Sequence, residues 1–331
     1  MDNLAVTQSE TASRGLAADR YAASPRSDRR PPSLTAAHHR RPGEAVAKMM
    51  LRLAAWLTIV ITVGIVIALI IPTLEFFAEV PITDFLFGTR WAPRFAQASF
   101  GVIPLITATA WTTAIALLTA VPLGLGSAVL LSEYAHPRLR QILKPILEIL
   151  AGVPTVVYGL FALAFVQSTV LRDWLHLPTG SFSVLAAGLV MGVMIVPTVA
   201  SLSEDAMSAV PNSMRQGSAA LGANRMQTSL RVVFPAALSG IVAAIVLGVS
   251  RAVGETMIVA IAAGGQARIV TGALEQGQTM TGFIANAALG DSRVGSIEYN
   301  TLFAVGLLLF TITLLINFIS IRFVRRFREA Y

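Results

Sequence analysis

Six long apolar stretches, separated by more polar connections, dominate the pattern of this chain. A helix needs about 17 to 25 mostly apolar residues to cross the hydrocarbon core of a bilayer. The stretches approach or exceed that length, so the pattern predicts an all-α integral membrane protein with six transmembrane helices. They lie near residues 51–72, 102–131, 146–168, 182–200, 237–263 and 301–321.

Prolines modify this prediction, because several of them begin or interrupt an apolar stretch. A proline inside a helix removes one backbone donor and clashes with the preceding turn. In a membrane, the carbonyl that is freed must find a partner in neighbouring protein. We therefore expect some of the six helices to be kinked or locally unwound. The prolines concerned are Pro104, Pro122, Pro154 and Pro197.

The composition also indicates a protein that resides in lipid. Apolar residues make up 55% of the chain and charged residues 13%, with a mean hydropathy of +0.69, well away from the soluble average. The chain has no cysteine and only four histidines, so we expect no disulfide, no metal site and no cofactor. The net charge of +7 is spread along the chain. It therefore predicts no nucleic-acid partner.

Residues 1–47 form a separate region that is rich in Ala, Ser, Arg and Pro. This composition buries too little apolar surface to fold, so it predicts a disordered, basic tail, followed by a membrane domain over 48–331. The pair Arg29-Arg30 is also found in twin-arginine export signals. The apolar stretch after it is long for a signal sequence and no small-residue cleavage site follows, so we interpret the tail as cytoplasmic.

The distribution of Lys and Arg predicts the orientation, since positive residues are retained on the cytoplasmic side of a membrane. They concentrate in the N-terminal region, in two connections and at the C-terminal end, and the opposite connections hold fewer. Both termini are therefore predicted to be cytoplasmic. The N-terminal basic residues continue through Lys48 and Arg52. The basic residues of that side further along the chain are Arg138, Arg140, Lys144, Arg215, Arg225, Arg231, Arg322, Arg325, Arg326 and Arg328, and those of the opposite side are Arg90, Arg94, Arg172, Arg268 and Arg293.

The basic connection at about 202–236 predicts a hairpin of two short helices. Small side chains fill the stretch 216–223, Gly222 allows the chain to turn, and Pro235 ends the second helix, which we expect over 224–234. Three residues of that second helix, Met226, Leu230 and Val233, form an apolar stripe suited to a groove in another protein. An ordinary amphipathic connection at the membrane surface is the alternative.

This hairpin resembles the EAA loop of bacterial ABC importer permeases, the loop that contacts the cytosolic ATPase. In that family an acidic residue and two small residues are followed, at fixed spacing, by a glycine, an aliphatic pair and a proline. Here the spacing is kept by Gly222 and Pro235, whereas the opening triplet is Gln216-Gly217-Ser218. The resemblance implies that these five residues couple the chain to an ATPase, through a neutral contact at Gln216.

Further segments resemble the PstC-type permease subunit of the bacterial phosphate importer, in the same order along the chain. The resemblance implies a type I ABC importer permease with a MetI-like fold, in the bacterial inner membrane. It also implies four kinds of partner: a related PstA-type permease, two PstB-type ATP-binding subunits, a periplasmic PstS-type phosphate-binding protein and the lipid bilayer. The segments lie at 100–105, 131–135, 143–145, 150–159 and 251–257.

Arg251 and Glu255 are the candidate substrate path within the membrane. An ionised group at the centre of a bilayer costs about 2.5 to 3.5 kcal/mol on insertion scales, so Arg251 is expected to face a path or another helix. A spacing of four places both groups on one face of a helix. Arg251 would then donate to a phosphate oxyanion while Glu255 holds the guanidinium, with Ser250 and Thr256 as further donors. A purely structural ion pair is the alternative.

The chain carries no ATP-binding motif of its own. Its two lysines, Lys48 and Lys144, do not lie in a Gly-Lys-Ser/Thr sequence, so it is not predicted to be an enzyme and its energy must come from a partner. Two alternatives remain open. The permease could carry sulfate or molybdate, or the chain could be a secondary transporter driven by protons through Glu255.

Overall fold

The computed structural model describes residues 42–290 and 293–326, and the chain divides into two compact units, one ending at Ile61 and the other beginning at Thr62. Helix α2 (Pro42–Glu79) crosses this boundary. Residues 42–47 were predicted to be part of the disordered tail, but they are the first residues of α2. Pro42 can start a helix, because the first helical position needs no backbone donor. The rest of the predicted tail lies outside the described residues.

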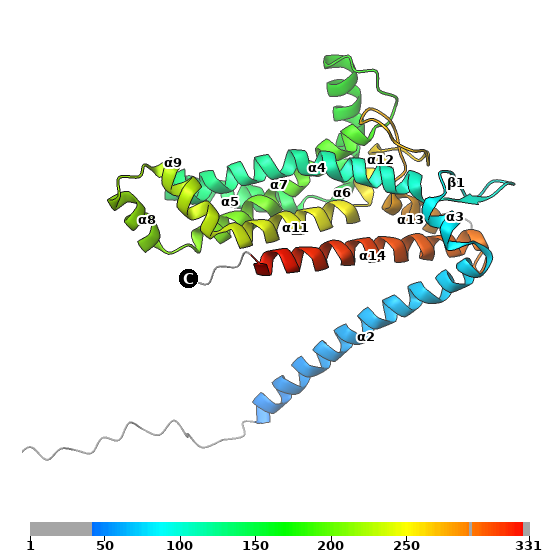
Figure 1. Cartoon of the computed structure of the whole chain (residues 1–331), viewed down its shortest axis with the longest axis horizontal. Coiled ribbons are helices and arrows are strands. Elements are labelled where there is room, and N and C mark those ends of the chain that lie inside the picture. Colours follow the sequence, from blue (N-terminus) through cyan, green and yellow to red (C-terminus); the bar gives the residue numbers. More distant parts are fainter. Residues whose placement is uncertain (1–41, 291–292, 327–331) are drawn as a thin grey trace, which may run out of the picture. The chain divides into compact units, whose positions relative to one another are not determined.

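Three helices form the centre of the second unit: α4 (Ile103–Val129), α7 (Val184–Ser208) and α11 (Leu238–Gly254). Figure 1 shows them side by side, with α14 (Ile297–Arg326) along α11. Glycines allow the close approach of α7 to α4. A Cβ added at Gly188 would lie 2.7 Å from the Cβ of Ile115, so a larger residue there would push the helices apart.

The two ends of this unit are built differently. One end carries a short antiparallel pair of strands, β1 (Trp91–Ala92) and β2 (Ser99–Phe100), together with α3 (Ile82–Phe87) and α13 (Met280–Ala288). The other end carries α8 (Asn212–Ala220) and α9 (Arg225–Thr228). The predicted cytoplasmic connections around Lys144 and Arg215 lie toward the second end.

Five described helices are long and apolar enough to span a membrane, or six when one bent pair is counted as a single span. This agrees with the predicted all-α class. The bent pair is the stretch Arg225–Ala236 with Leu238–Gly254, which meet at an angle of 72°. The first stretch consists of α9, the π-helical segment η3 (Ser229–Val233) and α10 (Phe234–Ala236). The helix thus continues through Pro235, and the predicted end at residue 234 is wrong by two residues.

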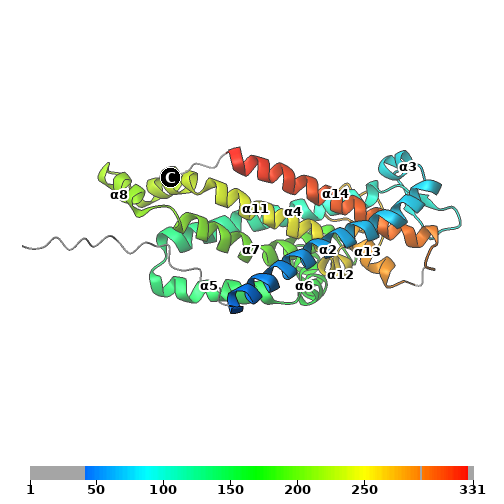
Figure 2. The ribbon, with the colours of Figure 1, turned by 90° about the horizontal axis from the view of Figure 1, so that it is seen from below.

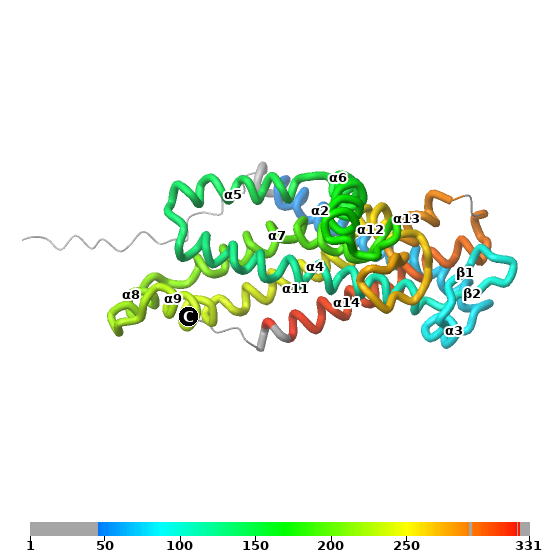
Figure 3. Tube along the Cα trace, turned by 90° about the horizontal axis from the view of Figure 1, so that it is seen from above, coloured from blue at the N-terminus to red at the C-terminus, as the bar shows by residue number. Residues whose placement is uncertain are grey.

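The third predicted span, 146–168, is not one helix. The amphipathic helix α5 (Pro137–Gly152) ends before Pro154, and the chain resumes as α6 (Thr155–Phe161), which continues as the π-helical segment η2 (Ala162–Trp174). The break follows from the sequence Gly-Val-Pro, since the residue before a proline disfavours helical geometry and Val153 is extended. Figures 2 and 3 show α7 between α5 and α11, and Figures 1 and 3 show α6 running crosswise to them.

Candidate functional site

Arg251 lies in the last turn of α11, partly buried, and reaches across to α7. Its Nη1 donates to the hydroxyl of Thr198 at 2.9 Å. Within the described ranges, no carboxylate lies within the ion-pairing distance of 4.0 Å from its guanidinium. A permanent positive charge is therefore placed between two membrane helices with one neutral hydroxyl as its side-chain partner.

Glu255 has a different role from the one predicted. Helix α11 ends at Gly254, and Glu255 is extended, with φ −65° and ψ 131°. Its Oε1 accepts from the backbone N–H of Met257 at 3.1 Å and of Ile258 at 3.3 Å, at the start of α12 (Met257–Ala262). The prediction that one helix face holds both charges is wrong, because α11 ends before Glu255 and the Glu255 side chain binds the free amides of α12.

The two hydroxyls predicted to assist Arg251 have other partners. Ser250 donates to the side-chain oxygen of Asn317 on α14 at 2.8 Å. Thr256 donates to the carbonyl of Gly254 at 3.2 Å. Neither bond involves Arg251, so the structure does not bring the four predicted residues together into one cluster.

Thr198 and Tyr158 lie near Arg251 but were not predicted as site residues. Tyr158 lies on α6 within electrostatic reach of Arg251, and its hydroxyl donates to the carbonyl of Leu150 across the α5–α6 break at 2.8 Å. Helix α6 packs closely on α12, since a Cβ at Gly159 would lie 3.2 Å from the carbonyl oxygen of Met257. The two interrupted helices thus meet beside the arginine. No local pattern marks a hydroxyl on a helix 53 positions away in the chain.

The hairpin has the predicted turn. Gly222 has a φ of +84°, a value that L side chains rarely adopt, and nothing lies within 4 Å of a Cβ built on it. Gln216 and Gly217 are exposed on α8, and the hydroxyls of Ser218 and Thr228 join the two arms at 3.0 Å. The triplet and the turn glycine are therefore presented at one end of the unit, with Gln216 open to a partner.

The predicted apolar stripe is only partly available to a partner. Met226 is 62% exposed and Leu230 is 50% exposed, whereas Val233 is fully buried against α7 and α11 residues. Leu221, beside the turn glycine, is 91% exposed and belongs to the exposed apolar surface instead. The inclusion of Val233 was wrong because η3 widens the helix by one residue per turn and shifts the face on which later side chains lie.

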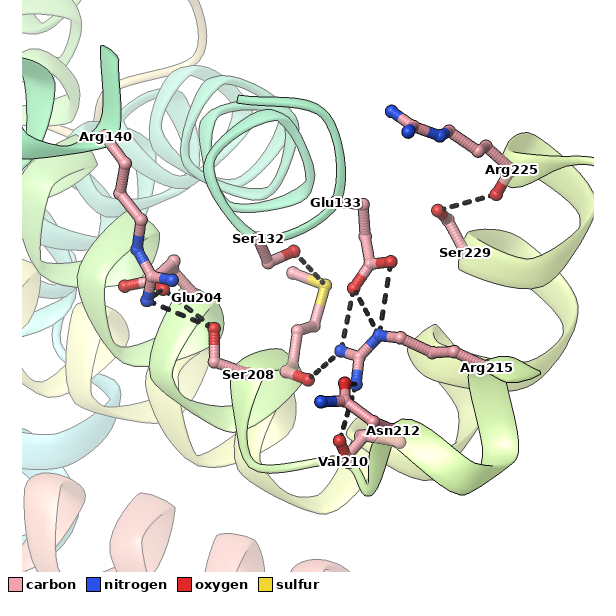
Figure 4. Close-up of polar contacts among 11 residues, drawn as sticks. Ser132, Glu133, Arg140, Glu204, Ser208, Val210, Asn212, Arg215, Arg225 and Ser229 are labelled. Atoms are coloured by element: carbon pink, nitrogen blue, oxygen red, sulfur yellow. Dashed lines mark hydrogen bonds and ion pairs between the residues drawn. The ribbon is translucent and has the colours of Figure 1, made fainter. Parts of the chain in front are cut away.

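Two ionic clusters stand at the base of the hairpin and were not predicted. In the first, the fully buried carboxylate of Glu204 accepts from Lys144 at 3.0 Å, from Ser208 at 2.9 Å and from Arg140. Hydrogen bonds to Asp205 and then to Glu204 raise the pKa of Lys144. In the second, Arg215 binds Glu133; Figure 4 shows this pair together with Arg140, Glu204 and Ser208 of the first cluster. Charged residues just beyond an apolar run are the only sequence signal for such clusters.

The fold, with its interrupted helices and exposed helical hairpin, defines a membrane permease. Residues 120–329 match the family of binding-protein-dependent transport system inner membrane components, and the chain belongs to this family. It is 34% identical over 295 residues to a probable ABC transporter permease protein, YqgH, of Bacillus subtilis, covering 87% of this chain and 94% of the relative. It is 32% identical to the phosphate transport system permease protein PstC of Mesorhizobium japonicum, over 82% and 87% of the two chains.

Solved structures agree on the fold. A bacterial alginate ABC transporter in complex with its alginate-bound periplasmic protein aligns with a TM-score of 0.61 at 16% identity, over 86% of this chain and 94% of the other. An inward-facing MetNI methionine ABC transporter aligns with a TM-score of 0.53 at 23% identity, over 68% and 96%. These likenesses confirm the predicted MetI-like fold, and the family match and the PstC relative confirm the predicted resemblance.

Proposed function

We propose that this chain is a permease subunit of an ATP-driven importer that carries inorganic phosphate across the bacterial cytoplasmic membrane. Relatives named as phosphate transport system permeases support the substrate. The exposed hairpin around Gly222 supports docking to a separate ATPase. The partners are a PstA-type permease, two PstB-type ATP-binding subunits and a PstS-type binding protein, with both termini of this chain in the cytoplasm.

One observation carries the assignment of an oxyanion as substrate: the charge of Arg251 has no carboxylate to neutralise it within the described part of the chain. A buried charge is stable only when it is paired and hydrogen-bonded. The planar guanidinium presents several N–H donors, and the bond to Thr198 uses one nitrogen. The remaining donors match the oxygens of a tetrahedral oxyanion.

The site also explains release of the anion. A path must bind its ion weakly enough to let it leave. One arginine, oriented by a neutral hydroxyl, attracts an anion without enclosing it. Sulfate and molybdate would be attracted by the same group, so selection between oxyanions is assigned to the binding protein.

Proton-driven transport through Glu255 is a poorer fit to the geometry. Glu255 is only 9% exposed, and its carboxylate accepts two backbone N–H bonds that hold the start of α12. A proton carrier must instead gain and lose its proton toward both sides of the membrane. Glu255 therefore serves as a cap for α12.

The assignment of Arg251 is tested by uptake of labelled phosphate into proteoliposomes that contain the assembled complex. Arg251→Ala is expected to lower uptake at least about tenfold, and Arg251→Lys to retain part of it, because lysine keeps the charge but loses the planar fork. An excess of unlabelled phosphate is expected to reduce the uptake of labelled phosphate, and an equal excess of sulfate is not. Uptake that is unchanged in Arg251→Ala would remove the assigned role, and equal competition by sulfate would remove the phosphate assignment.

A further inference from the structure

The side chain of Arg215 connects the hairpin to two membrane helices. It stands on α8, directly before the exposed Gln216, and points toward Glu133 (Figure 4). Its Nη2 donates to Glu133 at 2.9 Å and to the carbonyl of Met207 at 2.8 Å. Nη1 donates to the carbonyl of Val210 at 2.5 Å. All three guanidinium nitrogens are engaged, since Nε also donates to Glu133, at 3.3 Å.

These partners lie on separate elements. Glu133 belongs to the π-helical segment η1 (Leu130–Tyr134), which continues α4 at its hairpin end. Met207 and Val210 lie at the C-terminal end of α7 and just beyond it. Free carbonyls and the negative end of the helix dipole favour a cation at that place. Arg215 therefore joins α8 to both α4 and α7.

The connection is charge-assisted and shielded from water. The side chain of Arg215 is 21% exposed and that of Glu133 is 10% exposed. An ion pair in this setting is difficult to break by removing one partner, because the other charge is left poorly solvated. The pair therefore fixes α8 to the ends of α4 and α7.

The second arm of the hairpin is attached to a different helix. It runs without a loop through α10 to the bend at Ala237 and into α11, which carries Arg251. Among the residues that the structure describes, the bond between Ser218 and Thr228 is the one side-chain hydrogen bond that joins the two arms. A displaced hairpin thus acts on α7, with Thr198, through Arg215, and on α11, with Arg251, through its backbone.

We infer that Arg215, held by Glu133, is the positioning residue that transmits movement of the hairpin to α4 and α7 and so changes the contact between Thr198 and Arg251. The π-helical geometry of η1 fits this role, because π-helical segments are rare in proteins and those that occur often lie at functional sites. The inference rests on the proposed function, because it requires a motor that moves the hairpin. It assigns Arg215 to coupling and not to the binding of ATPase or substrate.

A double-mutant cycle in the reconstituted complex tests this inference. Arg215→Gln, Glu133→Gln and the double variant are compared for co-purified ATPase, ATP hydrolysis and phosphate uptake per ATP. Arg231→Gln is the matched control, because Arg231 is an exposed arginine of the second arm. Arg215→Gln is expected to lower uptake per ATP about tenfold with normal co-purification, and the double variant to be no worse. Arg231→Gln is expected to match the wild type.

Different results overturn different statements. A wild-type complex without ATP-dependent uptake would reject the proposed function. If the wild-type complex does show ATP-dependent uptake, three results would reject the coupling role alone. The first is a normal uptake per ATP in Arg215→Gln, and the second is an equal effect of Arg215→Gln and Arg231→Gln. The third is that the effects of Arg215→Gln and Glu133→Gln add up in the double variant. If Arg215→Gln does not fold, Arg215→Lys takes its place: a lowered ratio supports coupling, and a wild-type ratio contradicts it.

Discussion

Arg251 and Glu255 are four residues apart in the sequence but face different partners, because α11 ends between them. Arg251 binds Thr198 on α7, and Glu255 binds the first amides of α12. The positive charge is therefore available to a ligand, and the negative charge stabilises backbone. Substitution of Arg251 is therefore expected to affect transport, and substitution of Glu255 is expected to affect stability.

Thr198→Val is expected to weaken transport without abolishing it. The substitution removes the hydroxyl that orients Arg251 and conserves the shape of the side chain. A hydrogen bond to a charged group contributes about 1.5 kcal/mol or more, so the KM for phosphate uptake is expected to rise roughly tenfold. Thr311→Val on α14 is the control, since Thr311 bonds only its own helix. Equal KM values for both variants would contradict the role of Thr198.

Glu255→Gln is expected to retain most of the uptake, since an amide oxygen can still accept from Met257 and Ile258. Glu255→Ala removes the acceptor and is expected to lower the stability of the permease by about 1 kcal/mol, the usual effect of losing a helix cap. Thermal unfolding in detergent measures this loss. Loss of uptake in Glu255→Gln with unchanged stability would favour the proton-driven alternative.

Gly222→Ala is expected to destabilise the hairpin through the backbone and not through a clash. The φ of +84° costs a residue with a Cβ about 1 to 2 kcal/mol, although there is open space around the position. Gly217→Ala is the matched control. Gly217 is helical and also has open space, so alanine there is expected to be neutral or stabilising by up to about 1 kcal/mol. Equal melting temperatures of Gly222→Ala and Gly217→Ala would argue against a strained turn at Gly222.

The Lys144 cluster predicts a specific pH dependence. Hydrogen bonds to Asp205 and Glu204 raise the pKa of Lys144 above its ordinary value of 10.5. A raised pKa stabilises the protonated folded state, so the contribution is complete below 10.5 and is lost as the pH rises through the higher folded-state pKa. The stability difference between wild type and Lys144→Met is therefore expected to be constant from neutral pH to about pH 10 and to shrink above it.

The sequence predicted the helical membrane class and the turn at Gly222, because both depend on local properties. Long apolar stretches and a glycine between two short helices can both be recognised directly in the sequence. The path around Arg251 was predicted incompletely. A four-residue spacing indicates one helix face only if the helix continues, and Gly254 ends it. The partners Thr198, Glu133 and Glu204 are brought close by packing between distant segments, which no local pattern records.

The most direct test of the account is the dependence of phosphate uptake on a separate ATPase. Proteoliposomes containing this chain with its partner permease and binding protein are measured with and without the ATP-binding subunits and ATP. The account predicts accumulation of labelled phosphate only when both the ATP-binding subunits and ATP are present. Accumulation by the membrane subunits alone under a pH gradient, unaffected by ATP, would contradict it.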